Sequence, residues 1–357
     1  MPPTVSVVIP VYNAAPYLEA CLDGIARLDP APLECIVVDD GSTDGSAAIA
    51  ERAGVKVLSC GSRRGVSFAR NLGAGAAHGE LLLFHDADVV APRGALARVL
   101  ERFAEDSTRD AVIGSYDEEP GSPGFISQYR NLLHAFVHQT SRPRTSTFWA
   151  GCGAIRRRVF LECGGFRESL TTMEDIDFGF RLRQAGREIW LDKGLRVKHL
   201  KALSFLESVR TDLFERAIPW TRLILRYRSM PADLNLQWTH RLSVLLVSLT
   251  AAAVPVLGAL WAADALPPGA APVCAGGAAA VVGLVGFLNR EFYRFLARRK
   301  GFWFALRAFP CHCLHYLCGG LGFAAGVLAS AVCPCVDRRS SAAGIARREW
   351  TPMDADR

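Results

Sequence analysis

Two long uncharged stretches divide this chain into unlike halves. Residues 242–263 and 271–288 contain no Asp, Glu, Lys or Arg, and the connector between them carries Pro267, Pro268 and Gly269. A helix of about 20 apolar residues is long enough to cross the hydrocarbon core of a bilayer. Buried helices of soluble proteins are sometimes this apolar, but seldom twice in succession across so short a loop. We therefore predict a pair of transmembrane helices that follows a soluble domain.

Basic residues on either side of these stretches predict the orientation of the pair. Cytoplasmic flanks of membrane helices carry an excess of Lys and Arg, and the connector at 264–270 has none. The flanks carry the following basic residues: Arg222, Arg226, Arg228, Arg241, Arg290, Arg294, Arg298, Arg299 and Lys300. The pattern predicts a multi-pass protein of the cell inner membrane with residues 1–241 in the cytoplasm.

A third apolar stretch at residues 308–336 has no formal charge, and its topology stays open. A span at 308–333 would put the basic tail, residues 337–357, on the outer side, against the positive-inside tendency. A re-entrant or interfacial segment is the alternative. The cysteines and histidines at 311–318 match no closed zinc pattern, so we expect no metal there.

The amino-terminal part alternates strands and helices. Residues 5–11 and 35–38 are apolar and rich in β-branched side chains, and residues 17–28 between them have helical spacing. Acidic and polar side chains follow the second strand, from Asp39 to Asp44. Ligands of open α/β sheets bind outside the carboxyl ends of the strands. Ser42 and Asp44 have the alternative role of capping the helix that starts near Ser46.

The next unit repeats this pattern. A short strand at 55–58 precedes a predicted helix at 65–77. A buried strand at 81–85 comes next and is followed by Asp86-Ala87-Asp88. Two carboxylates around one small residue suit a hard divalent cation such as Mg²⁺ or Mn²⁺, although Asp is also common in turns. Arg70, on the preceding helix, is placed to bind a diphosphate held near these acids.

These segments carry a resemblance to a known family. VVIPVYN, VVDDGSTD and GVSFARNLGAGAAHGELLLFHDADV occur in that order, and the chain resembles the family 2 glycosyltransferases across most of residues 4–200. The resemblance implies a GT-A fold of the α/β class over residues 1–207 and a nucleotide-diphosphate sugar as donor. The residues that it assigns to donor binding are Pro10, Tyr12, Asn13, Asp39 or Asp40 against the base, Ser42, Arg70 and Asp86. Asp86 and Asp88 would hold the metal, Mn²⁺ or Mg²⁺.

Motifs further along the chain contain the candidate residues for the acceptor site and for the general base. Trp149 and Gly151 are expected to line the acceptor site. In similar enzymes the acidic pair of a motif like Met173 to Phe178 supplies the general base. We assign Asp175 as the base and Glu174 as the residue that orients the acceptor. A capping box from Thr171 or Thr172 to this acidic pair is an alternative that is compatible with the base.

His199, after a short strand at 195–200, is a further candidate. The resemblance implies a metal ligand here, and a neutral imidazole suits Mn²⁺. A lone histidine is also a common structural residue, so the ligand role is one of two interpretations.

Residues 208–241 connect the predicted domain to the membrane region, 242–336. Aromatic and aliphatic side chains alternate with arginines over 208–228, as in helices that lie in a headgroup plane, although a plain linker helix has the same composition. The formal net charge of +6 comes from many arginines and only five lysines. Their position beside the apolar stretches favours anionic lipids over nucleic acid.

The function that follows is metal-dependent transfer of a sugar from a nucleotide-diphosphate sugar to a lipid-linked or otherwise membrane-associated acceptor. The resemblance implies direct attack with inversion at the sugar carbon, for which one base and no carboxylate nucleophile are expected. The alternative is a membrane scaffold or sugar-nucleotide sensor that keeps the fold without turnover. A base beside a metal site favours the enzyme.

Overall fold

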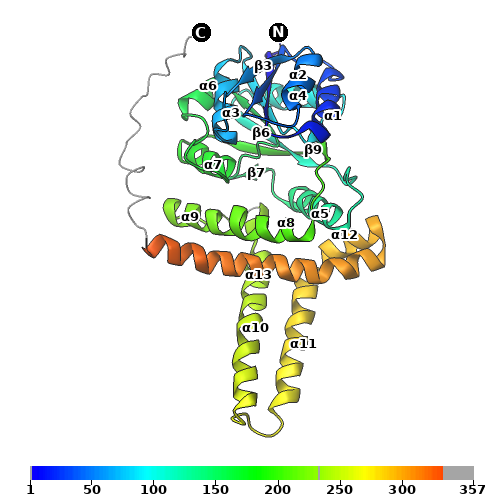
Figure 1. Ribbon diagram of the computed structural model, residues 1–357, viewed down its shortest axis with the longest axis vertical. Coiled ribbons are helices and arrows are strands. Elements are labelled where there is room, and N and C mark those ends of the chain that lie inside the picture. The colour runs from blue at the N-terminus through cyan, green and yellow to red at the C-terminus, as the bar shows by residue number, and fades with distance from the viewer. Residues whose placement is uncertain (1, 232–233, 333–357) are drawn as a thin grey trace.

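The computed structural model describes residues 2–231 and 234–332. Its amino-terminal part is an α/β domain, below which lie the helices of the carboxyl-terminal part (Figure 1). The strands are β1 Val5–Val11, β2 Glu34–Asp39, β3 Lys56–Ser59, β4 Leu81–His85, β5 Val89–Val90, β6 Ala111–Tyr116, β7 Arg144–Thr145, β8 Cys152–Arg156 and β9 Ile189–His199. The helices of the α/β domain are α1 Ala15–Ala26, α2 Ser46–Arg52, α3 Val66–Gly75, α4 Ala95–Glu105, α5 Phe125–Thr140, α6 Arg157–Glu162 and α7 Glu174–Gln184.

The strands form one mixed sheet. Its order is β3-β2-β1-β4-β8-β6-β9-β5, and β7 pairs with β9. The first four are parallel, and β8 runs antiparallel to β4. The predicted strands at 5–11, 35–38, 55–58 and 81–85 are confirmed within a residue or two. The strand predicted at 195–200 is the end of the much longer β9.

Alternate residues of β1 point into two different cores. Val8 packs with Ile36 and Val38 on one face of the sheet, whereas Val7 and Ile9 pack with Leu18 of α1 on the other. Helices therefore cover both faces, and such strands are apolar throughout instead of alternating. This explains why residues 5–11 form a continuous hydrophobic run.

The helical part begins with three nearly continuous segments, α8 Phe205–Arg210, η1 Thr211–Ala217 and α9 Ile218–Tyr227, of which η1 is a π-helix. A short 3₁₀ turn, η2 Leu234–Leu236, precedes α10 Trp238–Ala262. The chain continues through α11 Ala270–Leu288, α12 Arg290–Lys300 and α13 Phe302–Val332. Among the described residues, α10, α11 and α13 are long and apolar enough to cross a membrane.

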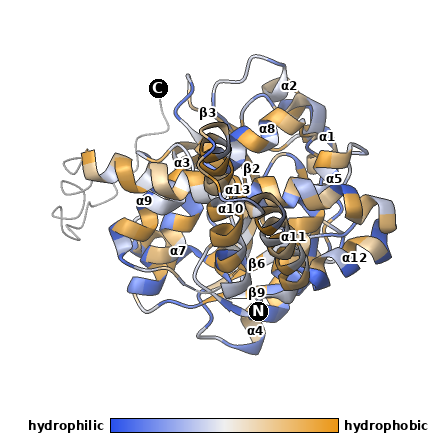
Figure 2. Cartoon of the chain, turned by 90° about the horizontal axis from the view of Figure 1, so that it is seen from below, coloured by the Kyte–Doolittle hydropathy of each residue, from blue (hydrophilic) through white to orange (hydrophobic). Residues whose placement is uncertain are grey.

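Helices α10 and α11 form a hairpin that projects away from the α/β domain, at the positions predicted for two spans (Figure 1). Most of their side chains are exposed to the surroundings. Seen from below, the hairpin stands under the domain, with hydrophobic residues along it (Figure 2). A water-exposed helix pair of this composition would be unfavourable, so the hairpin needs an apolar environment.

Helix α13 lies crosswise to the hairpin, beneath α8, η1 and α9 (Figure 1). Gly322 and Gly326 face Ala217 and Thr221 so closely that an added Cβ would overlap those residues. This lengthwise packing favours the interfacial alternative for the third apolar stretch over a span at 308–333. Residues 333–336 and the predicted tail 337–357 lie outside the described residues.

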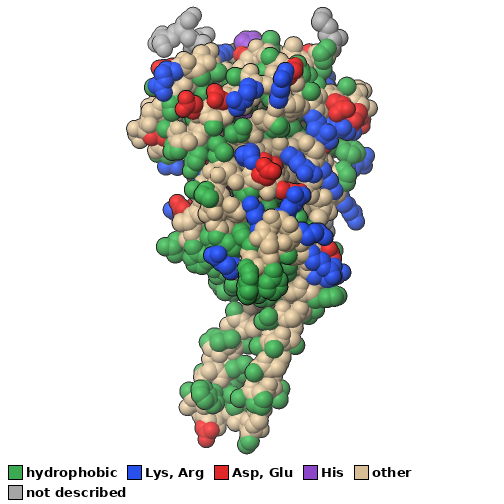
Figure 3. Space-filling view, turned by 90° about the vertical axis from the view of Figure 1, so that its right-hand side faces the viewer, with side chains coloured by type: hydrophobic (Ala, Val, Ile, Leu, Met, Phe, Trp, Pro, Cys, Tyr) green, Lys and Arg blue, Asp and Glu red, His purple; other side chains and the backbone are tan. Residues whose placement is uncertain are grey.

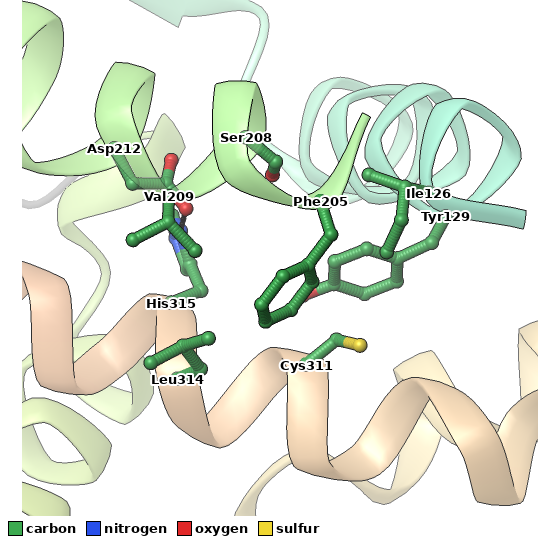
Figure 4. A pocket seen from close by; sticks show the side chains of 9 residues that line it. All are labelled: Ile126, Tyr129, Phe205, Ser208, Val209, Asp212, Cys311, Leu314 and His315. Atoms are coloured by element: carbon green, nitrogen blue, oxygen red, sulfur yellow. Dashed lines mark hydrogen bonds and ion pairs between the residues drawn. The ribbon is translucent and has the colours of Figure 1, made fainter. Parts of the chain in front are cut away.

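An ion-pair network joins the domain to these helices. Arg130 Nη1 of α5 donates to Asp212 Oδ2 at 2.8 Å, and its Nη2 lies 2.7 Å from Asp212 Oδ1 as an ion pair. His315 Nδ1 of α13 lies 2.8 Å from Asp212 Oδ2. Burial raises the pKa of Asp212, but His315 and Arg130 overcome this and hold it well below its usual range. Figure 4 shows Asp212 and His315 pointing toward each other at one end of a small pocket whose other walls are mostly apolar, among them Phe205 and Leu314.

Close packing of α3 on the sheet yields a first prediction. A Cβ at Gly73 would overlap Val8 and lie 3.0 Å from Val38 Cγ2. Overpacking of this kind costs about 1–3 kcal/mol, so we expect Gly73→Ala to lower the melting temperature of the full chain by several degrees in detergent. Because Val8→Ala removes the overlapping methyl groups, the double variant Val8→Ala/Gly73→Ala should lose less stability than the two single losses added together. Strict additivity would contradict the overlap.

Candidate active site at the carboxyl edge of the sheet

Three parallel strands end side by side at one edge of the sheet. β1, β2 and β4 are neighbours, and their last residues are Val11, Asp39 and His85. The polar residues predicted to bind the donor follow these ends, and a parallel arrangement brings them to one edge.

The loops after β1 and β2 are tied together. The backbone N–H of Asn13 donates to Ser42 Oγ at 3.0 Å, and the Asn13 side-chain oxygen accepts from Thr43 N at 2.8 Å. Asn13 has a left-handed backbone with φ of 50°, a conformation that Asn tolerates better than most residues. Tyr12 is exposed, and the Arg63 guanidinium lies 4.2 Å from its ring centroid. Pro10 is partly buried near the end of β1.

Asp39 and Asp40 have different partners. Asp40 accepts from the backbone N–H groups of Arg64 and Gly65, at 2.6 and 2.8 Å, and so holds the start of α3. Among the described residues, Ser42 N is the one group that donates to Asp39, at 3.2 Å from Oδ1 and 3.4 Å from Oδ2. A carboxylate offers about four acceptor positions, so Asp39 keeps the larger free capacity for a ligand.

Neither predicted capping residue is the cap of α2. That position is Gly45, with φ of 87°. Asp44 does accept from Ser46 N at 3.0 Å, and its other oxygen accepts from Ala15 N at the start of α1. Asp44 therefore links two helix starts, while Ser42 belongs to the β1–β2 loop contact.

Arg70 forms a bridge between the two acidic motifs. Its Nη2 lies 2.7 Å from Asp86 Oδ1, and its Nη1 lies 2.5 Å from Glu174 Oε1. Only 4 % of Arg70 is exposed. A buried guanidinium needs such partners, because an unpaired buried charge is strongly unfavourable. The predicted donor side and the predicted base motif therefore lie next to each other, although they are about a hundred residues apart in sequence.

Asp175 has the pKa of a useful base. It is partly exposed, and its Oδ1 accepts from the backbone N–H of Ile176 at 2.8 Å. Burial, followed by the negative charge of Glu174, raises the pKa of Asp175 to about 7. A base with a pKa near the operating pH is effective in proton transfer.

The predicted capping box at this motif is wrong. Helix α7 begins at Glu174 after Met173, which is left-handed with φ of 61°, and no side chain caps it. The carboxylates in the first turn instead face the positive end of the helix dipole. Asp177 is fully buried, accepts from Arg181 Nε at 2.9 Å and from the Tyr227 hydroxyl at 2.7 Å, and so ties α7 to α9.

Asp88 and His199 lie together because β5 pairs with the end of β9. His199 Nε2 is 3.6 Å from Asp88 Oδ2. Burial raises the pKa of Asp88, but the contact with His199 outweighs it, so the pKa is lower than usual. The Tyr116 ring stacks on the His199 imidazole at a centroid distance of 4.5 Å and fixes its plane.

The donor atoms at this edge fit a divalent cation in part. Within the described residues, no three His, Cys, Asp or Glu side chains form a group that could hold a metal ion, because Asp86 is engaged with Arg70 while Asp88 and His199 form a pair. One carboxylate and one imidazole suit Mn²⁺. Cations bound with nucleotides commonly take their remaining ligands from phosphate oxygens and water.

Trp149 and Gly151 lie beside this edge. The carbonyl of Gly151 accepts from Asp86 N at 3.2 Å. A Cβ at Gly151 would lie 2.7 Å from the Trp149 indole, so only glycine lets the ring pack there. Trp149 also contacts Tyr116 edge to face, with centroids 4.9 Å apart.

Three residues near the site were not predicted. Tyr116 stacks on His199, and the partly buried His134 lies 5.0 Å from the Trp149 ring centroid. Burial lowers the pKa of Arg216 in η1, although the negative charge of Asp175 is among those that raise it. None of the three belongs to a recognisable motif. Arg216 could be seen in the sequence only as one of several arginines in an amphipathic stretch.

Comparisons with known proteins agree with this geometry. Residues 6–165 match the family model Glycosyl transferase family 2. The uncharacterized glycosyltransferase EpsJ of Bacillus subtilis is 31% identical over 212 residues, which cover 55% of this chain and 61% of EpsJ. Glycosyltransferase GlyG of Streptococcus pneumoniae is 33% identical over 126 residues, which cover 33% of this chain and 42% of GlyG. The chain thus spans less than two thirds of these relatives.

A solved structure shares the fold. Mannosyltransferase PcManGT from Pyrobaculum calidifontis, solved with GDP-Man and Mn²⁺, has a TM-score of 0.50 at 22% identity and covers 90% of this chain and 87% of its own. At this identity the likeness concerns the fold, which is of the GT-A type. Residues 6–165 thus resemble glycosyl transferase family 2 in sequence, and the domain that contains them has a GT-A type fold.

Proposed function

We propose that this protein is a membrane-anchored, metal-dependent glycosyltransferase that moves a sugar from a nucleotide-diphosphate donor to a hydroxyl of a membrane-associated acceptor, with inversion. The observation that carries the proposal is the bridge from Asp86 through Arg70 to Glu174. It sets acids suited to a cation that would hold the donor diphosphate beside Asp175, a carboxylate whose pKa is raised to about 7.

The donor would bind along the strand ends. Asp39, which has free acceptor capacity, is our choice for the nucleotide base, and Pro10, Tyr12, Asn13 and Ser42 would line the same pocket. Asp40 supports the start of α3 instead. Arg70 would bind a diphosphate oxygen as a charge-assisted donor.

Asp88 and His199, with Asp86, would hold the cation, Mn²⁺ or Mg²⁺. When bound, the cation would neutralise charge on the departing nucleoside diphosphate. The pair is preformed through β5 and β9, and Tyr116 keeps the imidazole in place. Asp86 can turn toward a cation only by weakening its contact with Arg70.

Asp175 would remove the proton from the acceptor hydroxyl as the oxygen attacks the sugar carbon. Glu174, fixed by Arg70, keeps the start of α7 in place, and Trp149 with Gly151 forms one wall of the acceptor site. One base and direct attack lead to inversion.

The helical part would anchor the enzyme. The α10–α11 hairpin would span the inner membrane, and α13 would lie at its cytoplasmic face beneath α8, η1 and α9. The basic flanks then face the cytoplasm, where nucleotide sugars are made. Figure 3 shows hydrophobic side chains gathered on the drawn face where the globular part meets the hairpin.

A scaffold or sensor with the same fold is the second candidate. The partly exposed Asp175 carboxylate with its raised pKa argues against it, because a binding protein gains nothing from keeping such an acid half-protonated near neutral pH. The first experiment below separates the two.

Removing the base should abolish turnover. We expect Asp175→Asn to lower nucleoside diphosphate release at least about 100-fold, the size of a general-base effect, in detergent-solubilised protein with Mn²⁺, a panel of nucleotide sugars and native lipid extract. Donor affinity, measured by calorimetry, should stay within a few-fold of wild type. Wild-type release by the variant would refute the role, and no release by the wild type with any donor would favour the sensor.

The rate of nucleoside diphosphate release should fall as the pH drops below neutrality. With a pKa of about 7, Asp175 is protonated and inactive as a base below that pH, so release should rise as the pH goes from 6 to 8. Glu174→Gln removes the neighbouring negative charge that helps to raise this pKa, and the limb should move to lower pH. A limb that stays in place, or moves upward, would contradict the coupling.

Loss of the proposed metal ligand should be distinguishable from loss of the base. We expect Asp88→Asn to lower release at least about 100-fold, in line with the several kcal/mol that a cation contributes, and to raise the Mn²⁺ concentration needed for half-maximal release. Asp23→Asn, an exposed acid on α1, is the matched control and should leave both quantities unchanged. Unchanged metal dependence in Asp88→Asn would exclude the ligand role.

A further inference from the structure

A corner of the helical part combines exposed aromatic and basic side chains. Gly301, with φ of 89°, separates α12 from α13 and turns the chain between them. Just after the turn, Phe302 is 65% exposed, Trp303 73% and Leu306 51%. Apolar side chains scattered singly are normal on a soluble protein, whereas three large ones so close together form a patch. We refer to residues 298–307 as the α12–α13 corner.

The exposed residues of the corner continue into an apolar stripe along α13. Leu321 and Leu328 are exposed as well, and Leu321 follows Trp303 by 18 positions, which is about five full turns of a helix. Ala308 and His312, on the other side of the helix, are buried against the rest of the protein. Helix α13 therefore turns one face toward the domain and an apolar face away from it.

The apolar face of α13 lies on the same side of the molecule as the hairpin. In Figure 1 the hairpin projects below α13, and the domain lies above it. Seen from below, α12 lies beside α11, and no other element covers it (Figure 2). The bilayer that would surround the hairpin, which is part of the proposed function, is therefore next to the corner. Trp side chains concentrate at the level of the lipid headgroups, and Trp303 would have that position.

Three cations of the corner have no acidic partner. Arg298, Lys300 and Arg307 are exposed, and within the described residues no hydrogen bond or ion pair engages them. The Arg307 guanidinium lies 4.4 Å from the centroid of the Phe125 ring, a contact that leaves its charge uncompensated. The other basic side chains of α12 do contact acids: Arg290 and Arg294 contact Glu291, and Arg299 contacts Glu118. Figure 3 shows Lys and Arg side chains next to the hydrophobic ones just above the hairpin.

Chain continuity keeps the corner close to the membrane surface. Helix α12 begins at Arg290, directly after the end of α11 at Leu288 and the single residue Asn289. Its 11 residues span about 16 Å, which limits how far the corner can lie from the end of the hairpin. A lipid headgroup is therefore the anion that reaches the corner most readily, because an acidic protein would have to compete with the bilayer for this surface.

We propose that the α12–α13 corner binds the headgroups of anionic phospholipids in the bilayer that holds the hairpin. Arg298, Lys300 and Arg307 would contact the phosphate, while Phe302 and Trp303 would lie among the headgroups and the first acyl carbons. Each Lys or Arg near an anionic membrane surface adds to the attraction. A zwitterionic headgroup is bound less well, because it carries an ammonium group of its own beside the phosphate.

The test is the lipid preference of the full chain in phosphatidylcholine vesicles. Electron paramagnetic resonance of trace spin-labelled lipids gives the affinity of the protein for phosphatidylglycerol relative to phosphatidylcholine. We expect the wild type to prefer phosphatidylglycerol by at least about 5-fold, the contribution of one basic residue near an anionic surface. The variant Arg298→Gln/Lys300→Gln/Arg307→Gln should prefer it by less than about 2-fold. High salt should also reduce the wild-type preference, because the attraction is electrostatic.

A charge-matched control separates the corner from the net charge of the chain. Arg27→Gln/Arg52→Gln/Arg158→Gln removes three exposed arginines of the α/β domain, at α1, α2 and α6, and should keep the wild-type preference. An equal loss in both triple variants, or a preference that persists without the three corner cations, would overturn the assignment. A wild type without any preference would also overturn it and leave the corner to a partner other than the bilayer.

A second measurement tests whether the corner touches the bilayer. The fluorescence of Trp303 is the difference between the wild type and Trp303→Phe. Phosphatidylcholine that is brominated on its acyl chains should quench this difference, whereas iodide in the water phase should quench it little, as expected for an indole at the membrane interface. Quenching by iodide alone would place Trp303 in water and contradict the proposal.

Folding and anchoring are checked separately. Melting temperatures show whether each variant is folded, and Arg298→Lys/Arg307→Lys, which keeps the charges, should retain the preference. Resistance to extraction from the vesicles by alkaline carbonate tests the anchoring that belongs to the proposed function. A chain that stays in the vesicles without a lipid preference would keep the anchoring and refute the headgroup site. An inactive protein with the preference would refute the enzyme and keep the site.

Discussion

The double ion pair of Arg70 is the interaction on which the site depends. The guanidinium is almost completely buried and is held by Asp86 on one side and Glu174 on the other. Removing either carboxylate would leave a buried charge partly unpaired, which is unfavourable by several kcal/mol, roughly 3–5 in measured cases. Because Arg70 sits on α3 and its partners follow β4 and begin α7, one side chain fixes three segments relative to one another. The close approach of Gly73 to Val8 is what lets α3 lie near enough to the sheet for this to happen.

The same bridge sets the chemistry of Asp175. Burial and Glu174 raise its pKa, and Arg70 lowers it, so that the balance falls near 7. Had Arg70 been free to pair with Asp175, the carboxylate would be ionised at all relevant pH values but would be a weak base. Sharing the guanidinium between Asp86 and Glu174 keeps Asp175 partly exposed and basic. The site therefore separates the acids into two groups, one that is paired with Arg70 and one whose raised pKa suits the proton transfer that we propose.

Sequence patterns predicted the strands well, because short apolar runs such as 5–11 and 81–85, which are followed by polar residues, have few other structures open to them. The same patterns did not predict which groups these side chains contact. The choice between Asp39 and Asp40 depends on where the backbone of Arg64 and Gly65 lies, and the start of α7 depends on a left-handed Met173. Both features depend on how the whole domain folds. The crosswise position of α13 depends on the fit of Gly322 and Gly326 against η1 and α9. Composition alone could predict only that the helix is long enough to span a membrane.

In the proposed enzyme, rigid attachment of the domain to the carboxyl-terminal helices would limit which acceptors can react. Phe292 and Leu296 of α12 and Ala305 and Ala308 of α13 belong to the same hydrophobic core as Val8 of the sheet, and Arg130, Asp212 and His315 tie α5 to η1 and α13. A domain held in this way cannot sample a wide volume, in contrast to one on a flexible tether. The height of Asp175 above the membrane surface is then set by folding. An acceptor must present its nucleophile at that height. A group carried close to a lipid headgroup is already there, so its binding does not involve the entropy loss of capture from solution.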